Sequence, residues 1–528
     1  MVPDKKGAGI RHTLGLLLFS SLILLPDRAS GLGTERWQVR GFLENNLVLR
    51  DSSGFQYGFM DDPEFVQFRT TFKIETDLGI RQGFRLSRNL EFRIERMFAA
   101  FRAAYDAIYD LRDFPIQNEF RTGDFELGRD NLKLDAELRE IYVDMSLSRF
   151  WMRIGRQIVS WGETDGFRIL DIVNPLDTSY NLFFIMPEEN RIPLYMGRFI
   201  FTLPDLKSFT NTDLEFVLIP DIRPTLQAPP GAPYAIPIPL EMPKIGNLQI
   251  QLATHEDVPS ARFENSEFGF RLTSLFKRLN FSLAYFYGIQ DNPSPKLASV
   301  DILFTGGTSI VSDDWTQLGL EEIIRAIREF QTDFGVTVNM DLIHPYVNVA
   351  GFSYNVFEDR TAVTFRGEFT YTWDMAVLDL TAPDLVGRSD RIDWALGFDR
   401  NTWIHPLNKS TTFLFSLQVI GRHYQEPIPN EGELLGFPVT LNLIRRDSYI
   451  TTLTARTTYY HGLIVPTLFL GIDFDALLLS NFMLQYFVNN YLSFTLGINA
   501  TWGKEVKDIE RDPFLRISEV SLKTVLQF

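Results

Sequence analysis

The chain contains no cysteine in its 528 residues, which excludes disulfide frameworks, thiolate metal sites and cysteine nucleophiles. It also lacks an excess of positive charge. The formal net charge is −16 and the pI is about 5.0, which argues against nucleic acid as a partner. Beyond residue 25 no apolar run approaches the roughly 20 residues that a membrane-spanning helix needs.

Catalytic signatures are absent as well. The sequence has no HExxH, GxSxG, P-loop or dinucleotide-binding pattern, and its 6 histidines are scattered. His255, Glu256 and Asp257 are adjacent and could bind a divalent cation, but such runs in exposed loops are ordinarily solvated. We therefore predict a protein that is not an enzyme, with no catalytic residue, no cofactor and no metal site.

The N-terminus has the pattern of a secretory signal. Lys5, Lys6 and Arg11 precede an apolar run over residues 14–25, and small residues follow near Gly31. The run is too short to span a bilayer. We predict a cleaved signal peptide at 1–31 and a single domain at 32–528, which either remains soluble outside the cytoplasm or enters a membrane as strands.

Aromatic residues are abundant, at 14% of the chain with 46 Phe, although charged residues make up 22% and the mean hydropathy is −0.05. Alternation with a period of two recurs along the chain and is clearest over residues 491–502. This pattern predicts about 18 strands (16–18), most of them long enough for a tilted membrane crossing. The candidate ranges are 36–50, 64–79, 89–109, 136–147, 150–161, 195–203, 212–220, 264–274, 278–290, 345–357, 361–373, 389–402, 410–424, 446–459, 463–473, 477–488, 491–502 and 517–528.

Short and long connections alternate between these strands. Two-residue links such as 148–149 and 489–490 separate long ones, among them 162–194, 221–263 and 291–344. Tight turns at one end and long loops at the other are typical of barrels in bacterial outer membranes. The predicted fold is all-β: a transmembrane antiparallel up-and-down β-barrel with short periplasmic turns and long extracellular loops. Within the 291–344 loop, helical spacing predicts a short helix over 315–330.

The C-terminus alternates apolar and polar residues and ends with Leu526 and Phe528. This ending resembles the terminal signal that the barrel-assembly machinery reads in outer-membrane barrels. We therefore expect that machinery, and the lipid and lipopolysaccharide of the outer membrane, as partners of this chain.

The strand at 150–161 and the loop after it supply the candidate pore residues. Alternation places Arg153 and Gln157 on the lumen face, but it would aim Arg156 at lipid, at a cost of about 2–4 kcal/mol. We therefore expect a bulge at Gly155 that turns Arg156 inward. Loop 162–194 is the candidate constriction, by analogy with general porins. Its candidate residues are Glu163, Asp165, Arg168, Asp171 and Asn174. The alternative is that these are ordinary external-loop charges paired with their neighbours.

The runs Gly155-Arg156-Gln157, Trp161-Gly162-Glu163 and 174–177 (NPLD) resemble a family of Gram-negative outer-membrane proteins known as a domain of unknown function. Genes of this family often lie beside RND-type (MMPL) exporters and a companion lipoprotein. The resemblance implies a barrel that works with an inner-membrane exporter and a periplasmic lipoprotein on hydrophobic or lipid-like cargo. It implies no catalytic residues.

The predicted function is a porin-like outer-membrane channel that passes small or hydrophobic solutes. One alternative is a non-channel barrel, acting as a receptor or adhesin through its long loops, or as a rim-bound enzyme. Another is a secreted soluble all-β binding protein. Extraction from membranes by carbonate or a mild salt wash would support the soluble protein.

Overall fold

The computed structural model describes most of the chain. The described residues are 37–51, 63–87, 90–116, 121–122, 125–126, 128–164, 167–181, 187–235, 249–304, 309–312, 334–429, 431–434, 437–440, 445–473, 477–503 and 518–528. The predicted signal peptide at 1–31 and the predicted helix at 315–330 lie outside them.

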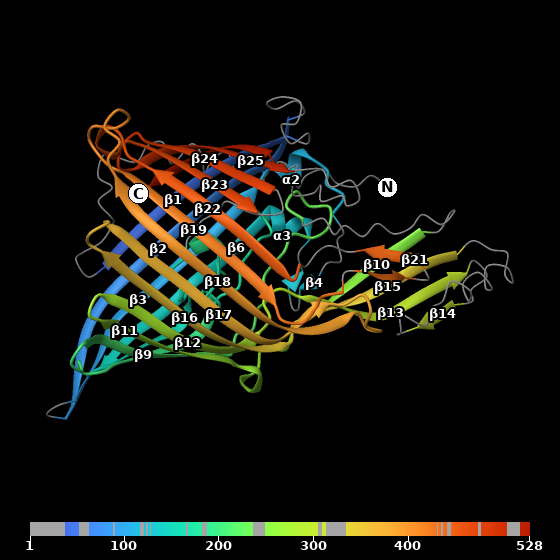
Figure 1. Cartoon of the computed structure of the whole chain (residues 1–528), viewed down its shortest axis with the longest axis horizontal. Helices are drawn as coiled ribbons and strands as arrows, with labels where there is room; N and C mark the ends of the chain where they lie inside the picture. Colours follow the sequence, from blue (N-terminus) through green and yellow to red (C-terminus); the bar gives the residue numbers. More distant parts are fainter. Residues whose placement is uncertain are drawn as a thin grey trace, which may run out of the picture.

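A ring of 18 antiparallel strands forms the body of the molecule, and β26 pairs with β1 to close it (Figure 1). In ring order the strands are β1 (Trp37–Asp51), β2 (Pro63–Ser87), β3 (Leu90–Asp106), β6 (Leu134–Leu147), β7 (Phe150–Gln157), β8 (Leu194–Thr202), β9 (Phe209–Ile219), β11 (Glu267–Phe276), β12 (Leu279–Ile289), β16 (Tyr346–Glu358), β17 (Val363–Leu378), β18 (Val386–Thr402), β19 (Phe413–Tyr424), β22 (Asp447–Arg456), β23 (Ile464–Asp473), β24 (Leu477–Phe487), β25 (Leu492–Gly503) and β26 (Ser518–Gln527).

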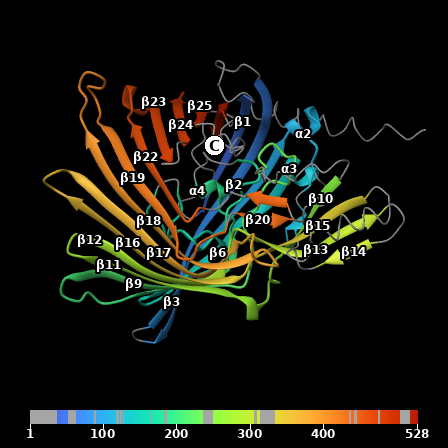
Figure 2. The same cartoon turned by 45° about the vertical axis from the view of Figure 1, so that its right-hand side comes forward.

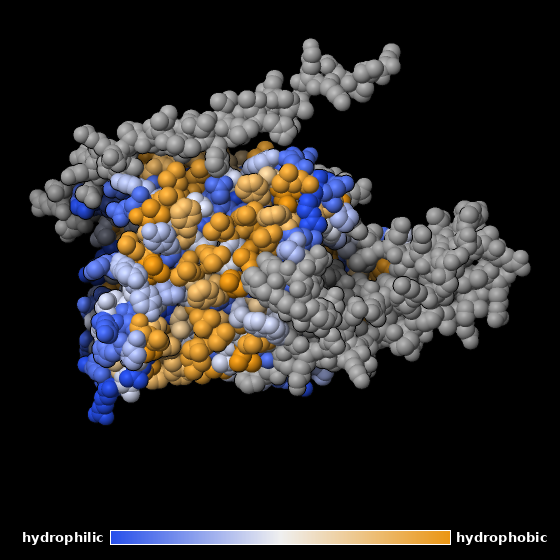
Figure 3. Space-filling model, turned by 90° about the horizontal axis from the view of Figure 1, so that it is seen from above, coloured by the Kyte–Doolittle hydropathy of each residue, from blue (hydrophilic) through white to orange (hydrophobic). Residues whose placement is uncertain are grey.

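The strands are apolar outside and more polar inside. On β18, for example, Leu396 faces outward and is 40% exposed, whereas its neighbour Ala395 is fully buried. Figure 3 shows the resulting apolar surface on the face of the barrel wall turned to the viewer. Because a closed ring gives each strand two hydrogen-bonded neighbours, the wall has no unpaired sheet edge.

The predicted fold class is confirmed. Each of the 18 ranges proposed from alternation overlaps one barrel strand. Long connections gather at one end of the barrel, where the non-barrel elements also lie (Figure 2). The alternation of loop lengths is nevertheless not strict, because residues 474–476 alone join β23 to β24 at the long-loop end.

The smaller elements lie mainly at the long-loop end. A second sheet has the order β10 (Gln249–Asp257), β15 (Phe334–Ile343), β13 (Ser294–Phe304) and β14 (Ser309–Ser312), with β10 and β15 parallel. The other elements are the hairpins β4 (Arg121–Thr122) with β5 (Phe125–Glu126) and β20 (Glu431–Leu434) with β21 (Phe437–Thr440), the helices α2 (Ile108–Leu111), α3 (Arg129–Lys133) and α4 (Pro187–Asn190), and the 3₁₀ turns Phe263–Asn265 and Tyr460–Gly462. None of the helices in the described residues is long and apolar enough to cross a bilayer.

The seam between β1 and β26 involves both residues of the predicted assembly signal. Leu526 pairs in register with Leu43 on β1 and with Leu492 on β25. Gly41 N donates to Phe528 O at 2.8 Å, and Phe528 N donates to Gly41 O at 2.9 Å. The Phe528 ring stacks near Phe72 with centroids 6.5 Å apart and covers the space where a β-carbon on Gly41 would lie.

We predict that Gly41→Ala displaces the Phe528 ring and lowers the free energy of unfolding by about 1–3 kcal/mol, the usual cost of overpacking. Urea unfolding in lipid vesicles measures the loss. Gly471→Ala is the control, because its added β-carbon would lie 3.4 Å from Phe469, an ordinary contact. In a Phe528→Ala background Gly41→Ala should cost much less, and an equal cost in both backgrounds would contradict the assigned contact.

Candidate functional site inside the barrel

Residues 158–193 connect β7 to β8. Their described parts (158–164, 167–181 and 187–193) fold into the barrel and are called the lumen segment below. Their apolar side chains are buried against inward-facing residues of the wall. The segment contributes Val159, Trp161, Leu170, Val173 and Ile192, and the wall contributes Leu194 and Met196 of β8, Val217 and Ile219 of β9, Ala284 and Phe286 of β12, and Val347 and Val349 of β16. Ile169 reaches further and packs against Ala395 on β18 and Ile420 on β19. The segment therefore crosses the lumen.

Glycines on the wall make room for the segment. A β-carbon at Gly269 on β11 would lie 2.6 Å from Trp161 Cη2, and one at Gly351 on β16 would overlap Leu170 Cδ1. Since real β-carbons are not found this close to other atoms, larger residues at these two positions would push the segment off the wall.

A carboxylate on β17 anchors the segment five strands around the ring from β8. Glu368 is 3% exposed, and its Oε1 accepts the backbone N–H groups of Glu163 and, at 2.7 Å, of Thr164. Its Oε2 accepts the N–H of Leu170 at 2.9 Å. Arg366, also on β17, donates to the carbonyl of Glu163. Charge-assisted bonds of this kind are stronger than neutral ones.

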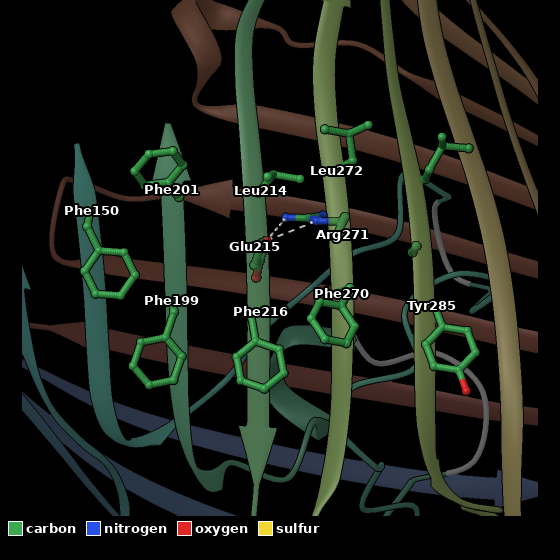
Figure 4. A pocket seen from close by; sticks show the side chains of 12 residues that line it. Phe150, Phe199, Phe201, Leu214, Glu215, Phe216, Phe270, Arg271, Leu272 and Tyr285 are labelled. Atoms are coloured by element: carbon green, nitrogen blue, oxygen red, sulfur yellow. Dashed lines mark hydrogen bonds and ion pairs between the residues drawn. The ribbon is translucent and has the colours of Figure 1, made fainter. Parts of the chain in front are cut away.

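Glu215 on β9 is a second anchor. Its Oε1 accepts from Trp161 Nε1 at 3.2 Å and from Arg198 Nε on β8 at 2.7 Å. Its Oε2 accepts from Arg271 on β11 at 2.8 Å. Figure 4 shows the Glu215–Arg271 pair beside Phe216 and Phe270. Phe270 is 51% exposed while Glu215 is 5% exposed, so the rings line a hollow on the outer face and the ion pair belongs to the inner face.

Three of the predicted pore residues hold the lumen segment in shape. Asp171 pairs with Arg191 at 2.7 Å, and both are buried. Asn174 accepts from Val159 N at 2.7 Å and donates to Ile192 O at 2.8 Å, which ties the two ends of the segment together. The Arg168 side chain donates to the carbonyls of Asp171 and Asn174, both at 2.6 Å. Their partners are thus mostly groups of the segment itself.

Arg156 is turned away from lipid, as expected, but not by a bulge in its own strand. It is 7% exposed and donates to Pro193 O at 3.1 Å and to Glu137 Oε2 at 2.9 Å. β7 pairs with β6 and β8 without any register shift, so the predicted bulge at Gly155 is wrong. Gly155 instead has φ +136°, which a residue with a side chain rarely adopts. The neighbouring shift lies in the β3–β6 pairing, around Arg139 on β6.

The remaining predicted residues fall in different places. Arg153 lies on the inner wall, bonded through Nε to Asp144 at 2.6 Å, with its guanidinium 3.8 Å from the Tyr142 ring centroid. Gln157 is fully buried and donates to Met196 O at 3.1 Å. The backbone of Glu163 forms hydrogen bonds with Glu368 and Arg366. Asp165 lies outside the described residues.

A second group of loop residues packs inside the barrel against β1 and β2. It comprises Ile108 and Tyr109 of α2, Leu132 of α3, and Ala228, Ala232 and Tyr234 from the loop after β9, against Val48 and Val66. Leu226 packs against both this group and the lumen segment, and its backbone pairs with Asp177. The two bodies therefore contact each other within the lumen.

Of the candidate metal ligands at 255–257, Glu256 contacts a histidine. Glu256 Oε1 on β10 lies 2.9 Å from His344 Nε2, and both side chains are buried. The other ring nitrogen of His344 lies 2.8 Å from Gln290 O. Nearby, burial raises the pKa of the Asp291 carboxyl to about 6, against the opposing effect of Arg168 at 3.9 Å. Across the residues that the structure describes, no group of three or more His, Asp or Glu side chains could hold a metal ion.

Sequence reasoning missed Glu368, Glu215, Arg191 and Arg198 as parts of the site. Glu368 had a usable signal, because it alternates with outward aromatic residues such as Phe369 and so lies on the inner face of its strand. Nothing in the sequence alone pairs Glu368 with Thr164, which lies 204 residues away along the chain.

The ring, the apolar outer surface and the loop bodies inside define a transmembrane-type β-barrel with a partly filled lumen. The chain belongs to the family described as "Protein of unknown function (DUF1302)", whose model matches residues 50–507. The resemblance drawn from the GRQ, WGE and NPLD runs is thereby confirmed. No curated protein sequence matches the chain.

Several solved porin structures are similar in fold. A BenF-like porin from Pseudomonas fluorescens Pf-5 aligns with a TM-score of 0.47 and 9% identity, covering 94% of this chain and 99% of that chain. OccAB2 from Acinetobacter baumannii aligns with a TM-score of 0.44 and 9% identity over the same shares. Pseudomonas aeruginosa OccK8 (OprE) aligns with a TM-score of 0.47 and 8% identity, again over 94% and 99%.

We predict that Glu368→Gln loosens the lumen segment, because an amide nitrogen cannot accept a hydrogen bond and at least one of the three N–H groups loses its partner. Such a loss costs about 1–3 kcal/mol. Hydrogen exchange at residues 163–170, followed by mass spectrometry, should accelerate about 10-fold. The matched control is Glu75→Gln, another inner-wall carboxylate, which pairs with Lys73 at 2.7 Å. Equal exchange in the two variants would refute the anchor.

Gly155→Ala should destabilise the barrel by about 2 kcal/mol or more, because the new β-carbon would overlap the carbonyl oxygen of Ile141 and φ +136° is strained for alanine. Urea unfolding monitored by tryptophan fluorescence measures the change. Gly471→Ala should be nearly neutral by comparison. If the two variants unfold alike, the conformation assigned to Gly155 and the placement of Arg156 are both wrong.

Proposed function

We propose that this protein is an outer-membrane channel whose lumen is narrowed by the lumen segment, and that it passes small solutes. The observation that carries the proposal is the segment itself, which is anchored by Glu368 across an 18-stranded barrel. A ring of this size is wide enough for an aqueous or plugged lumen, since barrel diameter grows with strand number.

The inner wall supports an aqueous path. Ion pairs that are partly open to water line it, among them Arg153–Asp144 and Arg96–Asp77, in which both Asp77 and Arg96 are 34% exposed. Charges of both signs beside a constriction select solutes by size and charge. Such a wall favours small hydrophilic solutes over the hydrophobic cargo that the family resemblance implied.

The location follows from the outer surface. The apolar outer surface matches a bilayer core, and outer membranes are where large bacterial barrels reside. Lipid, lipopolysaccharide and the barrel-assembly machinery are then its expected partners, with Leu526 and Phe528 at the closing seam as the recognised ending. Coupling to an inner-membrane RND-type exporter and a periplasmic lipoprotein rests on the resemblance alone and stays a prediction.

A non-channel barrel is the second candidate, and one observation favours it. Two loop bodies occupy the lumen from opposite walls and meet at Leu226, so the passage could be closed. The barrel would then act through its loops, as a receptor or adhesin. Conductance of the purified full chain in planar bilayers distinguishes the channel from the non-channel barrel, because a sealed barrel conducts no ions. We propose no catalytic role for either.

If the protein conducts, Arg153→Glu should shift the reversal potential in a KCl gradient toward cation selectivity, because it reverses a charge on the lumen wall. Arg149→Glu is the control, with the same charge change in the exposed turn before β7. Absence of conductance in the wild-type chain would contradict the channel. Unchanged selectivity in a conducting Arg153→Glu variant would remove Arg153 from the path.

A further inference from the structure

Two arginines face each other on neighbouring strands of the inner wall. Arg153 on β7 pairs in register with Arg198 on β8. Like charges in directly opposite positions on a sheet repel. Each arginine is held from its other side, Arg153 by Asp144 on β6 at 2.6 Å and Arg198 by Glu215 on β9 at 2.7 Å. The two acids thus flank the two cations, and among the described residues no carboxylate forms an ion pair with both arginines.

An aromatic ring lies next to both guanidiniums. Trp151 is two residues before Arg153, on the same face of β7. Its ring centroid is 5.3 Å from Arg153 Cζ and 5.8 Å from Arg198 Cζ. Cation–π attraction to a shared ring keeps the two side chains close to each other despite their charge.

Hydrogen-bond donors remain available at this place. Arg153 uses Nε and one terminal nitrogen on Asp144, whereas Arg198 uses only Nε, on Glu215. Among the described residues, the two terminal nitrogens of Arg198 have no hydrogen-bond partner. The side chains are 16% and 20% exposed, so water and small solutes in the lumen can reach them.

The ion pairs beside the two arginines form two separate groups. In the first, Asp77, Arg96, Asp144 and Arg153 contribute two charges of each sign. In the second, Arg198 and Arg271 share the single carboxylate of Glu215, which leaves this group with one unbalanced positive charge. One bound monoanion would balance that charge.

We propose that Arg153 and Arg198 form a binding site for the carboxylate group of small solutes in the lumen. The planar fork of a guanidinium matches the two oxygens of a carboxylate, and a pair of forks outcompetes a spherical halide for such a ligand. The one unbalanced positive charge of the Arg198–Glu215–Arg271 group suits a monoanion better than a phosphate dianion. The inference deepens the proposed function, on which it rests, by naming the solute class that the channel holds.

Calorimetric titration of the detergent-purified full chain with sodium acetate tests the site. Arg198→Gln should weaken acetate binding about 10-fold or more, because charge-assisted hydrogen bonds are lost. Arg198→Lys should also weaken it, since an ammonium keeps the charge but lacks the fork, and it retains a cation beside Glu215 if the glutamine variant fails to fold. Lys277→Gln, which removes a positive charge in an exposed turn, should bind like the wild type.

Three results would overturn the site: no acetate binding to the wild-type chain, equal affinity in wild type and both Arg198 variants, or tighter binding of inorganic phosphate than of acetate. Bilayer conductance is recorded on the same protein. A chain that conducts without binding acetate contradicts the site alone. One that binds acetate through Arg198 without conducting contradicts the channel and leaves the site intact.

Discussion

The whole architecture depends on pairing backbone hydrogen bonds where no water can supply them. In a hydrocarbon layer a strand with a free edge would leave a row of N–H and C=O groups unpaired, so only a closed ring is stable. The β1–β26 seam meets this requirement, down to the reciprocal bonds between Gly41 and Phe528. The lumen segment also has backbone N–H and C=O groups to pair, and some of these form hydrogen bonds with side chains of the barrel wall.

The wall and the segment it encloses complement each other in size as well as polarity. Large side chains of the segment meet small residues of the wall, as Trp161 does at Gly269 and Leu170 does at Gly351. Exposed backbone of the segment meets carboxylate or guanidinium groups on β17. The wall is therefore a packed interface at Leu194 and Met196 of β8, and a charged, partly exposed surface further along the same strand, where Arg198 faces Arg153 on β7.

Periodicity of two was enough to predict every barrel strand, because the two faces of each strand meet opposite environments. It could not predict departures from that period. Strict alternation with Phe68 would place Val66 on the outer face, but a register shift at Val48/Leu49 turns its side chain into the inner cluster. The sheet containing β10 and β15 was missed because its strands lie far apart in two segments read as loops. Asp171 was identified, yet its buried partner Arg191 depends on how the loop folds back.

The lumen segment leaves from β7, returns to β8, and is held at its far point by Glu368 on β17. The segment therefore connects two distant parts of the strand ring and restrains the distance between them. The ring cannot become rounder or flatter at that level without stretching the bonds to Glu163, Thr164 and Leu170. The shape of the barrel cross-section and the position of the lumen segment are therefore coupled, so lateral pressure on the wall would be transmitted to the segment.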